Sequence, residues 1–87
     1  MTNRREFFHG LLERVKFEPH FPAREVVTSQ LDYLLSVLDG RASRDQLSKI
    51  SLGLFAVRNL DGWDNSDLPD LLFKAQSEAE GMQKEDI

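Results

Sequence analysis

The sequence predicts an all-α fold, a small antiparallel bundle of four helices. Four segments carry apolar residues every three or four positions, the spacing that places side chains on one face of a helix. Capping residues, glycine and proline separate these segments by short connections, which favour antiparallel neighbours. No segment shows the strict alternation of a strand. The 87 residues suffice for one core, so we expect a single domain over residues 1–81 and a frayed tail over residues 82–87.

The first helix is expected over residues 3–17. Asn3 can cap its start, and Glu6 stands three residues on, in the capping-box position. Pro19 disfavours the helical conformation at Glu18, so the helix should end there. The apolar face of this helix consists of Phe7, Phe8, Leu11, Leu12 and Val15.

The second helix is expected from about Ala23 to Asp39. Pro22 can occupy its first position, where a missing N–H costs no helical hydrogen bond. Gly40 suits the left-handed conformation that commonly follows a helix end. The buried seam consists of Val27, Leu31, Leu34 and Leu38, broadened by Val26, Leu35 and Val37.

The third helix is expected to start at Ser43, with Gln46 completing a capping box, and to stop at Gly62. Gly53 lies inside it, where glycine costs about 1 kcal/mol relative to alanine. We therefore expect another backbone or a bulky side chain to approach closely at Gly53. The buried face consists of Leu47, Ile50, Leu54 and Val57, with Phe55 and Leu60 beside them.

The fourth helix is expected to begin near Ser66 or Asp67 and to end at Gly81. Asp67 and Asp70 suit the positive end of a helix dipole, and Pro69 is tolerated because it falls in the first turn. The buried stripe consists of Leu68, Leu71, Leu72, Ala75 and Ala79.

The formal net charge of −4 is unevenly distributed. Residues 1–44 hold seven Lys and Arg against six Asp and Glu, a balance of +1, whereas residues 45–87 hold four against nine, a balance of −5. The second and third helices around Gly40 have the order of a helix-turn-helix, but an acidic half repels phosphates, so we expect no nucleic-acid partner. A basic protein surface would be attracted instead.

No segment approaches the roughly 18 uninterrupted apolar residues of a membrane span, so we expect no membrane partner. Residues 3–8 loosely resemble a twin-arginine export signal, but Glu13, Arg14 and Lys16 interrupt the apolar stretch that such a signal needs. The chain contains no cysteine, which excludes disulfides and thiolate metal sites and is compatible with a reducing cytoplasm.

Catalytic and metal-binding signatures are missing from the sequence. His9 and His20 do not form a zinc-binding arrangement, and there is no glycine-flanked serine nucleophile or phosphate-binding loop. The acidic run that starts at Asp61 fails the calcium-loop spacing, because Trp63 and Ser66 stand at its third and sixth positions. We therefore expect no enzyme activity, no metal and no cofactor.

The most informative segment is the connector before the fourth helix, in which four aspartates accompany the only tryptophan. Asp67 and Asp70 have a sufficient explanation at the start of that helix. Asp61 and Asp64 are harder to explain as caps. Trp63 either folds back onto the core or anchors a partner.

A family resemblance rests on two runs, SQLDYLLSVL at residues 29–38 and RDQLSKISLGLFAVR at residues 44–58. Their clearest parts are the Gln-Leu-x-Tyr sequence of the second helix and the Leu-Gly-x-x-Ala-Val-basic sequence of the third. Over about residues 19–80 the chain resembles the small helical immunity proteins that protect bacteria from type VI secretion effectors which hydrolyse NAD(P).

This resemblance implies a non-enzymatic, cytoplasmic inhibitor that binds the catalytic domain of a toxin and blocks access to the dinucleotide. The cleft of an NAD(P) glycohydrolase must hold two or more phosphates and should carry basic groups. We therefore expect the toxin-binding residues to be Asp61, Trp63, Asp64, Asp67 and Asp70, with the tryptophan as an apolar anchor.

Two other functions are compatible with the residues. The first is an adaptor or dimerisation module that pairs through its second or fourth helix and has no toxin partner. The second is a small helical enzyme or ligand-binding bundle that uses Tyr33 and Asp32, which requires a pocket with a perturbed carboxylate. The oligomeric state stays open.

Overall fold

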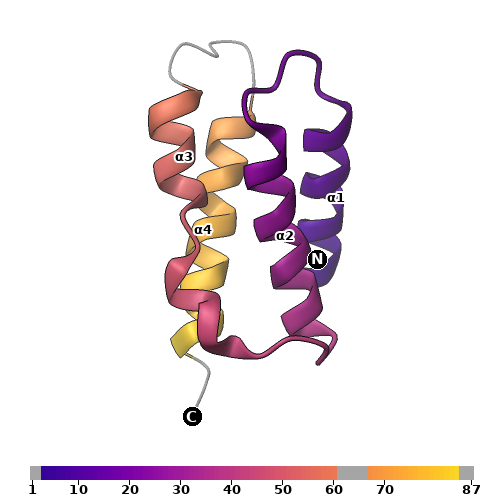
Figure 1. Ribbon diagram of the computed structural model, residues 1–87, viewed down its shortest axis with the longest axis vertical. Coiled ribbons are helices and arrows are strands. Elements are labelled where there is room, and N and C mark those ends of the chain that lie inside the picture. The colour runs from indigo at the N-terminus through magenta and orange to yellow at the C-terminus, as the bar shows by residue number, and fades with distance from the viewer. Residues whose placement is uncertain (1–2, 61–66, 85–87) are drawn as a thin grey trace. The chain divides into compact units, whose positions relative to one another are not determined.

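The computed structural model describes residues 3–60 and 67–84 (Figure 1). These residues form helices and no strand, which confirms the predicted all-α fold. The chain divides into two compact units, Met1–Asp45 and Gln46–Ile87. The elements are α1 (Arg4–Phe17), α2 (Arg24–Leu38), the 3-10 helix η1 (Arg44–Lys49), α3 (Leu52–Asn59) and α4 (Leu68–Lys84).

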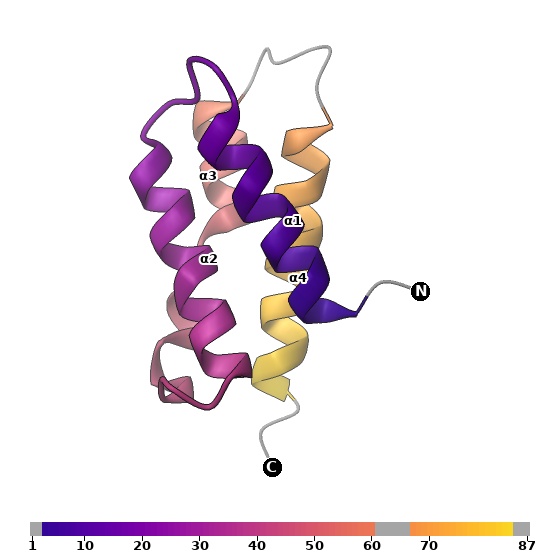
Figure 2. The same ribbon diagram turned by 90° about the vertical axis from the view of Figure 1, so that its right-hand side faces the viewer.

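The first unit is a hairpin in which α1 packs against α2 (Figures 1 and 2). The side chain of Asn3 accepts a hydrogen bond from the backbone N–H of Glu6 at 2.8 Å, so the predicted N-cap of α1 is confirmed. Glu18 is extended before Pro19, which ends α1 where the proline predicts. The buried apolar residues of the two helices are Phe8, Leu11, Leu12 and Val15 on α1, and Val27, Leu31, Leu34, Leu35 and Val37 on α2.

The turn between α1 and α2 differs from the prediction that Pro22 opens the second helix. Ala23 adopts a left-handed conformation with φ of 44°, and α2 begins only at Arg24. His20 is also left-handed, with φ of 62°. The Arg24 guanidinium donates to the carbonyl of Glu18 at 2.6 Å and closes the turn. This return of the chain needs non-helical backbone after Pro22, so the proline lies outside the helix.

The end of α2 follows the prediction at Gly40, which has φ of 75°. Its N–H donates to the carbonyl of Val37 at 3.1 Å, and the N–H of Arg41 donates to the carbonyl of Ser36 at 2.8 Å. This pair of bonds is the Schellman arrangement that terminates a helix. The Arg5 guanidinium lies 2.5 Å from the carboxylate of Asp39 and so links the start of α1 to the end of α2.

The predicted continuous third helix is wrong, because it is divided into η1 and α3. Ser51 has φ of −133° and ψ of 36°, and its carbonyl accepts from the N–H of Phe55 at 2.9 Å to start α3. The Ser43 hydroxyl accepts from the N–H of Asp45 at 3.4 Å, rather than from that of Gln46 as the capping box requires. The break therefore gives α3 a new start and a new buried face.

The buried face of α3 consists of Leu52, Gly53, Phe55 and Ala56. Leu54 and Val57, which the continuous pattern assigns to the core, are instead 51% and 59% exposed. Leu47, Ile50 and Leu60 are buried as expected.

The second unit contains the packed pair α3 and α4 (Figure 1). Gly53 lies at the contact between these two helices. A Cβ atom at Gly53 would lie 3.3 Å from Cδ1 of Phe73 and 3.4 Å from Cγ of Gln76. The Gly53 N–H also donates to Oε1 of Gln76 at 3.3 Å. The close approach predicted at this glycine is confirmed.

The fourth helix runs through Gly81 to Lys84, so the prediction that it ends at Gly81 is wrong. Met82 is only 1% exposed, and the burial of this apolar side chain favours continuing the helix past the glycine. The buried residues of α4 are Leu68, Leu72, Ala75, Ala79 and Met82.

Candidate functional site

The predicted acidic site is only partly within the described residues. Asp61, Trp63 and Asp64 lie outside them. Asp67 and Asp70 are both exposed at the start of α4. The Asp67 carbonyl accepts from the N–H of Leu71 at 3.0 Å, so this residue begins the hydrogen-bonding ladder of the helix.

Asp70 lies in the first turn of α4, where the helix dipole favours a carboxylate. The stabilising role predicted for Asp67 and Asp70 therefore fits their positions. Because both residues are exposed, the same positions leave them on the surface of the α3·α4 pair.

Large apolar side chains are exposed on the same pair of helices, and we call Leu54, Val57 and Phe73 the apolar patch. Their exposed fractions are 51%, 59% and 46%. The Phe73 ring lies against Gly53, since a Cβ there would be 3.3 Å from the ring. Val57 follows Gly53 by four residues on the same side of α3, and Leu54 precedes Val57 by three. Leu54 and Val57 are therefore neighbours on α3, and the Phe73 ring of α4 lies against the glycine one turn before Val57.

Polar residues border the apolar patch. Arg58 follows Leu54 by one turn, and the two help to line a shallow hollow on α3 together with Ser51, Phe55 and Asn59. On α4, Asp70 precedes Phe73 by three residues and is exposed beside it. The patch therefore has charges of both signs at its edge.

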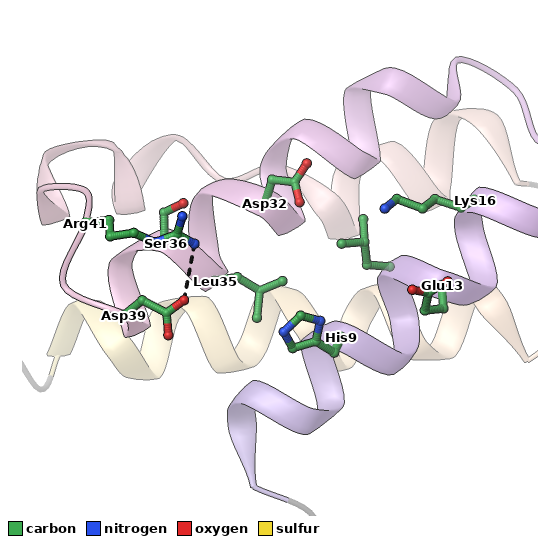
Figure 3. A pocket seen from close by; sticks show the side chains of 9 residues that line it. His9, Glu13, Lys16, Asp32, Leu35, Ser36, Asp39 and Arg41 are labelled. Carbon is green, nitrogen blue, oxygen red and sulfur yellow. Dashed lines mark hydrogen bonds and ion pairs between the residues drawn. The ribbon is translucent and has the colours of Figure 1, made fainter.

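A second, more polar pocket of about 390 Å³ lies on the α1·α2 hairpin (Figure 3). Its charged groups come from both helices and from the turn after α2, where Nη2 of Arg41 lies 3.2 Å from Oδ2 of Asp39. The lining residues are His9, Leu12, Glu13, Lys16, Asp32, Leu35, Ser36, Asp39 and Arg41. Ligand pockets are mostly apolar with a few polar groups, and this lining has the opposite balance.

The residues of this pocket do not form a catalytic arrangement. Asp32 and His9 are exposed. The Tyr33 hydroxyl donates to the carbonyl of Ser43 at 2.7 Å and so ties α2 to the segment that follows it. Among the described residues, no group of three or more His, Asp or Glu side chains is placed to hold a metal ion. The arrangement gives no support to a helical enzyme built on Tyr33 and Asp32.

Comparison with known protein families matches residues 5–80 to Tsi6. The chain belongs to the Tsi6 family. This is a family of type VI secretion immunity proteins, in which Tsi6 neutralises Tse6, an NAD(P)+ glycohydrolase toxin. Tsi6 immunity proteins are non-enzymatic inhibitors, so the expectation that the chain is not an enzyme is confirmed. Comparisons with curated proteins and with solved structures found no match.

Family membership gives the chain a partner class, the cognate toxin of a type VI secretion system. The matched region also covers α1 from its second residue onward, where the resemblance seen over about residues 19–80 is weaker. In the described part of the chain, each helix is too short or too polar to cross a membrane. The apolar patch is the surface feature that sequence reasoning missed, because its residues fit the core pattern of an uninterrupted helix.

Proposed function

We propose that this chain is a cytoplasmic immunity protein that binds the catalytic domain of one cognate type VI secretion toxin and blocks its active-site cleft. The observation that carries the proposal is the family match over residues 5–80. We further propose that the toxin is an NAD(P) glycohydrolase, the activity of the toxin that Tsi6 neutralises. Such a toxin consumes a cytoplasmic cofactor, so its inhibitor must act in the cytoplasm.

The inhibitory contact follows from the chemistry of a dinucleotide cleft. A cleft that holds two or more phosphates carries basic groups, and these attract carboxylates. We propose that Asp61 and Asp64 meet those basic groups together with Asp67 and Asp70, and that Trp63 inserts between them as an apolar anchor. The exposure of both described aspartates and the balance of −5 in residues 45–87 support this contact.

Co-expression with the toxin encoded beside this chain's gene tests the function. The toxin alone should lower cellular NAD(P) and stop growth, and the chain should preserve both. Replacing Asp61 and Asp64 together by lysine should remove protection and weaken binding at least about tenfold, since two attractive contacts become repulsive. Binding is measured by calorimetry on the purified toxin catalytic domain, and helicity by circular dichroism.

The matched control replaces Glu13 and Asp32 by lysine, which changes the net charge equally at exposed positions of the α1·α2 hairpin. It should retain protection. Growth arrest and NAD(P) loss in the presence of the wild-type chain would refute the immunity role. Full affinity in the Asp61 and Asp64 variant would instead refute the acidic contact alone.

A further inference from the structure

The exposure of the apolar patch on the α3·α4 pair is energetically unfavourable. Leu54, Val57 and Phe73 leave large apolar surfaces in water, and burial of such side chains is favourable. Single exposed apolar residues are ordinary, but adjacent ones commonly mark an interaction site. Among the described residues of the α1·α2 hairpin, the exposed large apolar side chains are Phe17 and Val26.

The outward position of the patch follows from the break in the third helical segment. In an uninterrupted helix, Leu54 and Val57 continue the stripe of Leu47 and Ile50. Because α3 restarts at Leu52, its core side is taken by Leu52, Phe55 and Ala56 instead. Leu54 and Val57 therefore remain exposed, because other residues of α3 form its buried face.

We propose that the apolar patch is a docking surface for the cognate toxin. In the complex, the patch contacts the apolar wall of the toxin's dinucleotide cleft. This inference rests on the proposed function and assigns it a second group of contact residues. A dinucleotide presents flat rings as well as phosphates, so its cleft needs apolar walls beside its basic groups. A matching inhibitor surface combines exposed apolar side chains with carboxylates.

The α3·α4 pair has this combination at one end. Val57 lies in the last turn of α3 and Phe73 lies in the second turn of α4, so both lie toward the end of the pair where α3 ends and α4 begins. Asp70 is exposed three residues before Phe73. The patch is therefore continuous along α4 with the described part of the proposed acidic contact.

The test uses Val57→Asp and Phe73→Ser, each in the full chain. Binding to a catalytically inactive form of the neighbouring toxin's catalytic domain should weaken at least about tenfold in each, as expected for central interface residues. Val57→Asp is informative because it adds negative charge. A purely electrostatic attraction to a basic cleft would strengthen with this change, so weakening identifies an apolar contact.

Val26→Asp and Phe17→Ser are matched controls, because they make the same substitutions at exposed positions of α2 and α1. Their affinities should stay within about threefold of the wild type, since peripheral surface changes have small effects. Circular dichroism and thermal unfolding establish that all four variants fold.

The outcomes separate this inference from the proposed function. If the lysine variant of Asp61 and Asp64 loses binding while both patch variants retain it, the docking role of the patch is wrong and the immunity function stands. If the wild-type chain does not bind the toxin, both proposals fail together. If light scattering shows a wild-type dimer that Phe73→Ser converts to a monomer, with toxin affinity unchanged, the patch is a contact between copies of this chain and the proposal is overturned.

Discussion

Two glycines show how the environment of a single residue decides its effect on stability. Gly10 lies inside α1, and apart from its chain neighbours and the nearby backbone of its own helix, no atom of the described residues lies within 4 Å of the position of a Cβ atom. Gly10→Ala should therefore raise the free energy of unfolding by about 0.5–1 kcal/mol, because alanine loses less backbone entropy. At Gly53 the new methyl group would meet the Phe73 ring at 3.3 Å. Gly53→Ala should therefore give no gain.

Urea unfolding followed by circular dichroism measures both changes on one scale. Equal stabilisation by the two alanines would show that Phe73 moves aside without cost, and it would contradict the close packing inferred at Gly53.

At the scale of an element, the end of α2 depends on the left-handed conformation of Gly40. Gly40→Ala should lower the free energy of unfolding by about 1–2 kcal/mol, because a Cβ atom disfavours φ of 75°. Steric crowding is not the cause, since within the described residues no atom beyond the two chain neighbours lies within 4 Å of that Cβ position. Gly40→Asn should cost less, because asparagine tolerates this conformation better. Thermal unfolding compares the two variants, and equal losses would contradict the conformational explanation.

The sequence predicted helix ends where a local signal decides them and failed where packing decides them. Asn3 and Gly40 act through bonds to nearby backbone groups, so neighbouring residues suffice to identify them. The break at Ser51 has no comparable signal, because two overlapping apolar stripes fit the segment and only packing against α4 selects one. At Gly81 a local signal is present but misleading. Glycine ordinarily ends a helix, yet the burial of Met82 favours continuing α4 past it.

The candidate site was predictable to the extent that it depends on residue type. The charge of the acidic segment and the aspartates at the start of α4 can be recognised from the sequence alone. The apolar patch cannot, because the same leucine and valine serve as core or surface according to the phase of the helix. The family match supplies a partner for this surface, which composition and spacing alone did not specify.

For the whole molecule, the two proposed contacts, the acidic segment and the apolar patch, should affect different rate constants of toxin binding. A balance of −5 in residues 45–87 attracts a basic cleft over distance, and salt screens this attraction. The association rate constant should therefore fall about tenfold between low ionic strength and about 0.5 M salt, while the dissociation rate constant changes little. Surface plasmon resonance with the inactive toxin domain measures both rates.

Variants of the acidic segment and of the apolar patch show which contact controls association and which controls dissociation. Lysines at positions 61 and 64 should slow association and flatten its salt dependence, because they reduce the attracting charge. Phe73→Ser should leave association nearly unchanged and speed dissociation, because apolar contacts form only after the surfaces meet. Salt-independent association of the wild-type chain would contradict steering by the acidic half. Slower association of Phe73→Ser with unchanged dissociation would contradict the separation of the two contacts.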